Sequence, residues 1–329
     1  MECSVARLSD LVREQSQGHL SDGQGAPLTR SGGGGSESAR RWYAVARQEL
    51  RRIRDGIRGN PAPRLAVCEE LAQSLVGDLQ ESDECLRWAL NGHTDDYLVD
   101  NALHVAVLSV KIGAGLRYTQ EELEQVALAG LLHDVGMWSL PDAVTDKAGT
   151  LTTEEMVAVR SHPERGRRML AGLGGGYTWV ATIIAQEHER WDGSGYPCRL
   201  KGTQIAEQAQ IVGLADVFDA LVTPRPYKKP IAPHQALREL LVHGKQAFSL
   251  RVLKSLGDQI TLYPVGTPVR LNTGAIGRVV KVNPRYPLRP TIEIPGDGRA
   301  GSKEREGELD LSMTASVHIV EVLPQAGLS

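Results

Sequence analysis

The chain has 329 residues, which is enough for two domains or for one domain with appended segments. Its formal charge of −3 argues against a general binder of nucleic-acid polymers, because such proteins usually carry a basic surplus. The four cysteines show neither CxxC nor paired spacing, so the sequence indicates no disulfide framework or zinc finger, and we expect a cytoplasmic protein. No apolar run approaches the roughly 20 residues of a membrane span.

Two regions precede the part of the chain that carries motifs. Residues 1–38 include a Gly/Ser-rich stretch that cannot form a buried core, and we expect this segment to be flexible. Residues 39–94 contain two helical patterns in which apolar residues recur at three- and four-residue steps. These helices show no residues with evident chemistry. We expect them to pack on the next domain or to pair in a homodimer, where signalling proteins could also bind.

The next region, residues 95–260, reads as consecutive helices without an alternating strand pattern. One of these helices is expected to begin after Thr152, because Glu155 follows at the spacing of a capping box. Residues 261–329 instead alternate Val, Leu and Ile between Gly, Pro and Asn turns, which is typical of short strands. The sequence therefore predicts a mainly α protein with a small C-terminal β module.

Histidines and carboxylates stand in or next to the predicted helices of the all-α region. His133 and Asp134 follow an apolar helix, and Asp216 lies within another, where an unpaired carboxylate would be unfavourable. The other candidates are His162, Glu187 and His188. For His133 and Asp134 alone, a buried histidine and a capping aspartate are the simpler interpretation. Together, however, such residues from several helices are how helical bundles build two-metal sites, and iron, manganese, zinc or nickel would suit them.

Five motifs in residues 96–256 resemble those of the HD-GYP domain phosphodiesterases of the HD superfamily. They are LLHDVGM, KAGTLTTEEM, SHPERG, HERWDGSGYP and ADVFDALVTPRPYKK. Members of this family are helical, hold two or three metal ions and hydrolyse cyclic di-GMP to a linear dinucleotide or to GMP. The resemblance implies an HD-type helical bundle in which a hydroxide that bridges two divalent metals attacks the phosphodiester. The segment beginning YPVGTPVRL is also similar to a β extension that follows some HD-GYP domains.

The resemblance also implies roles for individual residues. Metal ligands by position are His133, Asp134, His162, His188 and Asp216, with Glu187 as a further candidate and Asp134 as the bridge between metals. Arg225 and Lys228 fall where the family contacts the substrate phosphates, although a solvated basic turn is the alternative. Gly195, Tyr196 and Pro197 would form the loop that shapes the substrate site. Tyr196 could instead be an aromatic plug that packs on the helices.

Three positions depart from the family pattern. Asn101 takes the place of a histidine ligand, and His104, on much the same helix face, either substitutes for it or simply faces the core. Met137 stands where the family has a lysine near the scissile phosphate, and Glu187 replaces the first of two histidines. Two alternatives to a cyclic di-GMP phosphodiesterase therefore stay open. One is a weakened domain that binds cyclic di-GMP or a partner protein in signalling, and the other is a phosphohydrolase for a different nucleotide.

Overall fold

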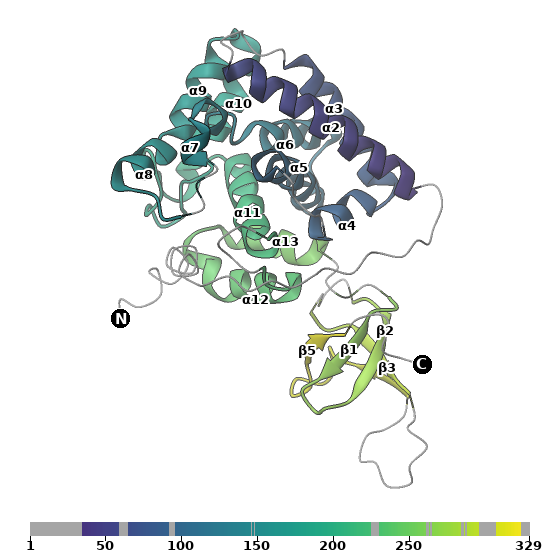
Figure 1. Cartoon of the computed structure of the whole chain (residues 1–329). Coiled ribbons are helices and arrows are strands. Elements are labelled where there is room, and N and C mark those ends of the chain that lie inside the picture. The colour runs from purple at the N-terminus through teal and green to yellow at the C-terminus, as the bar shows by residue number, and fades with distance from the viewer. Residues whose placement is uncertain are drawn as a thin grey trace. The chain divides into compact units, whose positions relative to one another are not determined.

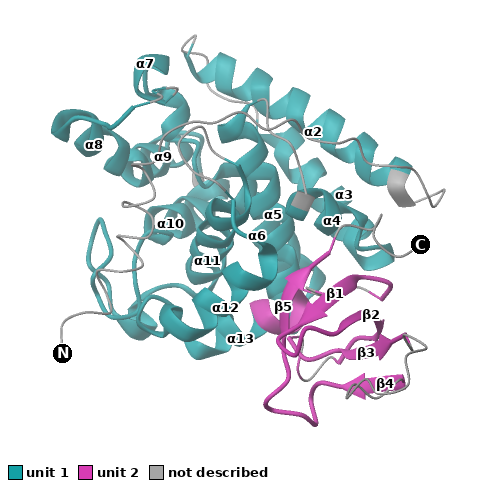
Figure 2. Ribbon diagram, turned by 60° about the horizontal axis from the view of Figure 1, so that its bottom comes forward, with its two compact units in different colours: residues 1–255 teal, residues 256–329 magenta. Residues whose placement is uncertain are grey.

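The computed structural model describes much of the chain and divides it into two compact units, residues 1–255 and residues 256–329 (Figure 2). The described residues are 35–58, 65–91, 96–145, 147, 149–224, 230–260, 263, 265–283, 286, 288–295 and 307–323. The expected flexible segment 1–38 lies outside them as far as residue 34. The last four residues of that segment, 35–38, belong to the first described helix, which begins at Gly35.

The first unit is helical, which confirms the predicted mainly α class (Figure 1). Its α-helices are α2 (Gly35–Arg58), α3 (Ala66–Glu81), α4 (Glu84–Asn91), α5 (Tyr97–Gly115), α6 (Gln120–Leu132), α7 (Asp142–Thr145), α8 (Thr153–Arg160), α9 (His162–Ala171), α10 (Thr178–Gln186), α11 (Glu207–Val222), α12 (Pro233–His243) and α13 (Leu250–Gln259), which runs across the unit boundary. Short 3-10 helices are η1 (Met137–Ser139), η2 (Gly175–Tyr177), η3 (Gly202–Gln204) and η4 (Gly244–Gln246). The capping box expected at Thr152 and Glu155 begins α8.

Helix α5 forms the centre of this unit, where α6 and α11 pack against it (Figure 1). It is buried on nearly every side, so it lacks the polar face of a surface helix. An 18-residue window of α5 is as apolar as a membrane span. However, 78% of that window is buried among the other helices, as in the core helix of a globular domain.

Helix α2 is attached to the start of α5 and to η1 by a row of arginines. Arg47 Nε lies 2.6 Å from Asp100 Oδ1, and Arg54 Nη1 lies 2.7 Å from Asp96 Oδ2. Further along the same helix, Arg58 Nε donates to a backbone carbonyl of η1 at 3.3 Å. Helix α2 therefore packs on the helical unit itself, against the start of α5 and against η1.

The second unit is an antiparallel sheet, which confirms the predicted small β module. Its strands are β1 (Pro268–Leu271), β2 (Ile276–Lys281), β3 (Thr291–Ile294), β4 (Gly307–Asp310) and β5 (Ile319–Val322), in the order β4-β3-β2-β1-β5. Val269, Val279 and Ile292 are fully buried and form its core with neighbouring aliphatic side chains. Gly277 allows β2 to approach β3, because a methyl group there would lie 2.6 Å from the Glu293 carbonyl oxygen.

Candidate metal centre

The centre begins where α6 ends. Helix α6 crosses α5 closely at Gly130, where an added methyl group would lie 2.6 Å from Ala106 Cα. His133 follows the last turn, and its Nδ1 donates to the Gly130 carbonyl at 2.8 Å. This bond leaves Nε2 buried with no hydrogen-bond partner in the described structure. A histidine held through Nδ1 in this way presents Nε2 as a metal ligand.

A second histidine is held in the same way at the start of α9. His162 Nδ1 donates to a backbone carbonyl at 2.7 Å, and its Nε2 lies 3.2 Å from Asp134 Oδ1 and 3.1 Å from Glu187 Oε1. His188 Nε2 lies only 3.1 Å from the same nitrogen. Two ring nitrogens at this distance need a proton or a cation between them, because their lone pairs repel. The ligand atoms of His162, Glu187 and His188 all lie within 4.8 Å of one another.

Helix α11 adds Asp216 to this group. Asp216 Oδ1 lies 4.0 Å from His133 Nε2, and Asp134 Oδ2 lies 3.6 Å from the same nitrogen. The helix can come this close because Gly213 has no side chain, and a methyl group there would overlap the Glu187 carbonyl oxygen. The structure thus brings all six candidate ligands together from four segments, namely His133, Asp134, His162, Glu187, His188 and Asp216.

Asn101 and His104 lie beside this group on α5, but they differ in their contacts. Asn101 Nδ2 donates to Asp216 Oδ1 at 3.2 Å and to Asp219 Oδ2 at 2.8 Å. His104 Nδ1 lies 2.9 Å from Asp219 Oδ1, to which Thr223 also donates. Burial would raise the pKa of Asp219, but the His104 charge and these hydrogen bonds lower it. His104 therefore pairs with Asp219, a buried carboxylate next to the centre, and not with one of the six candidates.

Sequence reasoning missed Asp219. Its signal was a second aspartate in the apolar run ADVFDAL, one helical turn after Asp216. Two carboxylates inside one apolar helix both need partners, and only one of them was assigned a role. The amide of Asn101 connects the two, which places it between the candidate ligands and the His104–Asp219 pair.

Charge is concentrated in the centre and shifts its pKa values. Burial alone would lower the pKa of His133, but Asp134, Glu187 and Asp216 raise it to about 9. Burial raises the pKa of Glu187 to about 7. Burial, together with the positive charge of neighbouring groups, lowers the pKa of His188 well below its ordinary value. The centre thus gathers three carboxylates, of which Glu187 is buried, among three imidazoles, an arrangement that a cation would stabilise.

These residues fit divalent metal ions. His133 Nε2 and Glu187 Oε2 are buried atoms without a hydrogen-bond partner in the described structure, and both belong to the group of candidate ligands. Buried polar atoms are normally paired, so two orphaned atoms in one cluster indicate a missing partner. Imidazole nitrogens with carboxylate oxygens suit iron, manganese, zinc or nickel.

The Gly195-Tyr196-Pro197 loop lies against the centre. Gly195 approaches the preceding backbone so closely that a methyl group would lie 2.5 Å from Glu189 Cα. Tyr196 N–H donates to the His188 carbonyl at 3.2 Å, and the two rings stack with centroids 4.7 Å apart and planes 16° apart. Tyr196 therefore packs on a candidate ligand and fixes the orientation of its ring.

Two charged residues in the same motif hold this loop, and sequence reasoning gave them no role. Glu189 is buried, and its carboxylate accepts the N–H groups of Cys198 at 2.6 Å and Leu200 at 3.0 Å. Arg190 donates to the carbonyls of Glu187 and Glu189 at 3.0 and 2.9 Å. Their signal was the charged run HER directly after an apolar helix, where buried charges need partners.

The remaining candidates are Arg225, Lys228 and the position of Met137. Arg225 and Lys228 lie outside the described residues, and Met137 is the first residue of η1 and is half-buried.

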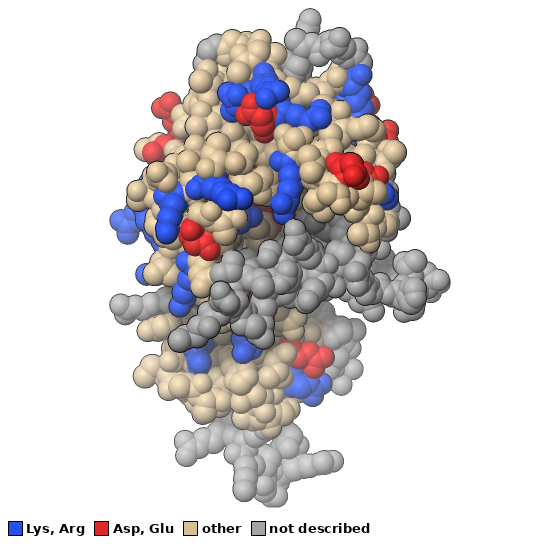
Figure 3. All heavy atoms as spheres, turned by 90° about the vertical axis from the view of Figure 1, so that its left-hand side faces the viewer, with Lys and Arg blue, Asp and Glu red and all other residues tan. Residues whose placement is uncertain are grey.

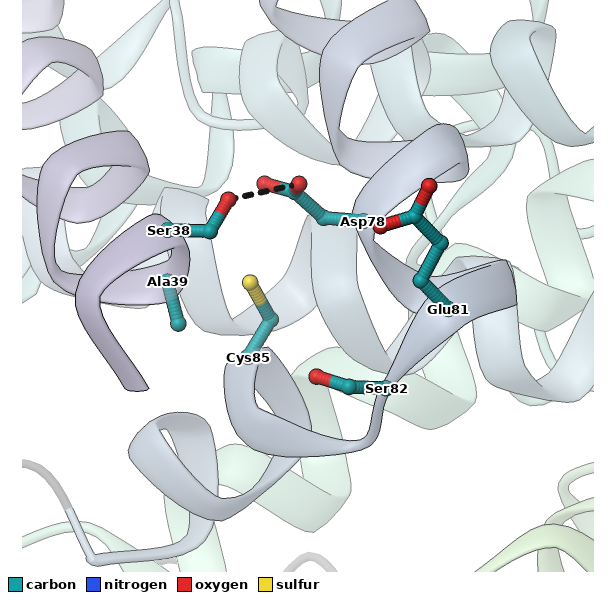
Figure 4. Close-up of a pocket in the computed structure, with 6 residues that line it drawn as sticks. All are labelled: Ser38, Ala39, Asp78, Glu81, Ser82 and Cys85. Atoms are coloured by element: carbon teal, nitrogen blue, oxygen red, sulfur yellow. Dashed lines mark hydrogen bonds between the residues drawn. The ribbon is translucent and has the colours of Figure 1, made fainter. Parts of the chain in front are cut away.

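A separate cavity of about 220 Å³ lies between α2, α3 and α4 and shares no residue with the centre (Figure 4). It is lined by Ser38, Ala39, Asp78, Glu81, Ser82 and Cys85. Ser38 Oγ donates to Asp78 Oδ1 across it at 2.9 Å.

Two family models match the chain. One, described as an HD domain, matches residues 81–249, and the other, a KOW domain associated with HD domain, matches residues 268–329. The HD model covers half of the chain. The chain belongs to the HD domain family. Its sequence carries both the HD pair and the GYP loop on which the resemblance to HD-GYP domains rests.

Relatives with curated functions agree with this assignment. The cyclic di-GMP phosphodiesterase PA4108 of Pseudomonas aeruginosa is 33% identical over 61% of the chain and 48% of its own length. The cyclic di-GMP phosphodiesterase response regulator RpfG of Xanthomonas campestris is 36% identical over 56% of the chain and 51% of its own length. A 3'3'-cGAMP-specific phosphodiesterase of Vibrio cholerae is 32% identical over 56% of the chain and 36% of its length. The chain thus spans about half the length of the first two of these relatives and less of the third.

A solved structure shares the fold. The HD-GYP protein Bd1817 of Bdellovibrio bacteriovorus superposes with a TM-score of 0.57 over 76% of each chain, at 17% sequence identity. At this identity the likeness concerns the fold and not the chemistry. It agrees with the helical arrangement that brings the candidate ligands together.

Proposed function

We propose that the helical unit is a metal-dependent phosphodiesterase that hydrolyses cyclic di-GMP to the linear dinucleotide or to GMP. The observation that carries this proposal is the meeting of three imidazole Nε2 atoms and three carboxylates from four segments of the chain. The relatives named as phosphodiesterases support the reaction class and the cyclic dinucleotide substrate. Because the chain spans only part of those relatives, both are proposals for this chain.

Asp134 is suited to bridge two divalent cations. Its Oδ1 lies 3.2 Å from His162 Nε2, and its Oδ2 lies 3.6 Å from His133 Nε2, so the two oxygens face different imidazoles. A carboxylate with one oxygen toward each half of a site is the usual geometry of a bridging ligand. One cation would be held with His133 and Asp216, and the other with His162, Glu187 and His188.

Such cations, when bound, activate a water molecule and neutralise charge on a phosphodiester. The chain's own groups position what reacts. Tyr196 holds the ring of His188 by stacking, and Gly195 lets the loop pack against the centre. Arg225 and Lys228 are proposed to bind the substrate phosphates, since a guanidinium fork matches phosphate oxygens.

Product analysis tests the proposal. The purified chain would be incubated with cyclic di-GMP and Mn²⁺, or with Fe²⁺ without oxygen, and the nucleotides separated by chromatography. We expect the linear dinucleotide or GMP from the wild type and no product from Asp134→Asn. A parallel assay with 3'3'-cGAMP shows whether both guanines are required. Tight binding of cyclic di-GMP without turnover, with either metal, would refute the enzyme and favour a signalling module that binds the nucleotide.

A further inference from the structure

The last residue of α8 places a cation at the GYP loop. Arg160 is exposed, and its guanidinium carbon lies 5.5 Å from the centre of the Tyr196 ring, over that ring. A guanidinium at this distance is attracted by the ring's π electrons. The same ring stacks on His188, so one aromatic side chain separates Arg160 from a candidate metal ligand.

Arg160 differs from the neighbouring arginines in having no hydrogen bond or ion pair within the described part of the chain. Arg165 donates to Ser161 Oγ at 2.9 Å, and Arg167 and Arg168 both pair with Glu164. Figure 3 shows Lys and Arg side chains gathered on the face that carries α8 and α9. The donors of Arg160 are therefore available to a ligand that arrives at this face.

The negative charge of the centre would repel an anionic substrate, and a nearby cation such as Arg160 would offset that repulsion. Asp134, Glu187 and Asp216 bring three carboxylates to a site that must accept an anionic substrate. Arg190 is nearby, but it donates to two backbone carbonyls, and its guanidinium lies 5.2 Å from the Phe248 ring. Among the described arginines of this region, Arg160 is the one that contacts the GYP loop and has no hydrogen-bond or ion-pair partner.

We propose that Arg160 is a substrate-binding residue, whose guanidinium binds a phosphate of the cyclic dinucleotide beside the metal centre. Tyr196 holds the guanidinium by a cation–π contact while leaving its N–H groups free for the phosphate oxygens. The inference rests on the proposed function, because it assigns a further contact to the same substrate.

The test compares wild type, Arg160→Gln, Arg160→Lys and the control Arg168→Gln in steady-state hydrolysis of cyclic di-GMP. Arg168 lies in the next helix, α9, is 74% exposed and pairs with Glu164, so its replacement removes the same charge without the Tyr196 contact. For Arg160→Gln we expect KM to rise about 10-fold, as for the loss of a charged hydrogen bond, with kcat within about twofold. Arg160→Lys should give an intermediate KM, because an ammonium keeps the charge but not the planar fork.

Metal content and thermal unfolding are measured on the same four proteins, and both should be unchanged. The KM of wild type should rise with ionic strength more steeply than that of Arg160→Gln, which a merely structural role would not produce. A KM for Arg160→Gln within twofold of wild type would overturn the inference while leaving the proposed function intact. A wild type that neither binds nor hydrolyses cyclic di-GMP would refute the proposed function, and this inference with it.

Discussion

Replacing Gly130 with alanine should disturb the metal centre without altering any candidate ligand. Gly130 lies where α6 crosses α5, and a methyl group there would lie 2.6 Å from Ala106 Cα and 2.8 Å from Ala106 N. Carbon atoms in contact are normally about 3.5 Å apart or more, so the two helices must separate by about 1 Å. The clash is with backbone, which cannot rotate away. The carbonyl of Gly130 also accepts the Nδ1–H that orients His133.

The size of the effect follows from this geometry. Overpacking a core usually lowers the free energy of unfolding by about 1–3 kcal/mol. Metal–ligand distances tolerate shifts of roughly 0.2 Å, so a movement of about 1 Å in α6 should weaken joint ligation by His133 and Asp216. Losing the group that orients a ligand typically lowers metal affinity about 10–100-fold, and we expect a loss in that range.

Urea unfolding and metal titration measure the two effects. Gly77→Ala in α3 is the matched control, because a methyl group there meets no atom within 4 Å. That change should raise the free energy of unfolding by about 0.5–1 kcal/mol through helix propensity and leave metal affinity unchanged. Wild-type stability and wild-type metal affinity in Gly130→Ala would show that the close crossing of α5 and α6 does not position the centre.

Three further predictions concern stability, the loop and pH. Arg47→Met leaves the carboxylate of Asp100, which is 1% exposed, without its ion-pair partner, and should lower the free energy of unfolding by about 3 kcal/mol. Adding Asp100→Asn should largely restore the stability, as measured by urea unfolding. Glu189→Gln removes a charged acceptor from two loop N–H groups and should speed their hydrogen exchange, and unchanged exchange would refute this role. Because the pKa of His133 is about 9, a metal must displace its proton at neutral pH. Metal affinity measured by calorimetry should therefore rise with pH toward about 9, and affinity independent of pH between 6 and 9 would contradict the assignment.

The helical class and the six candidate ligands could be predicted from the sequence, because a metal site needs particular residue types and the motifs contain them in the expected order. The sequence could not predict how side chains from distant segments pair. His104 faces Asp219, a contact between α5 and α11 that periodicity cannot give for a helix buried on nearly every side. Arg160 likewise meets the loop through a contact across 36 positions of sequence that no spacing rule reveals.

The boundary between the expected flexible segment and the first helix was also predicted wrongly from composition. The Gly/Ser-rich segment was expected to be flexible as far as residue 38, whereas α2 begins at Gly35. Glycine and serine are favourable residues at a helix start, and the packing of the following turn outweighs their weak propensity. Ala39 and Trp42 are buried there, and Trp42 Nε1 donates to the Leu71 carbonyl at 3.1 Å.

One titration tests the central claim most directly. The protein is stripped with a chelator, and hydrolysis of cyclic di-GMP is followed as Mn²⁺ is added back, with bound metal counted by elemental analysis. The account predicts no turnover in the stripped protein, a rise to a plateau near two bound ions per chain, and loss of both binding and turnover in His162→Ala. Turnover that survives complete removal of metal, or full metal loading with no turnover, would contradict it.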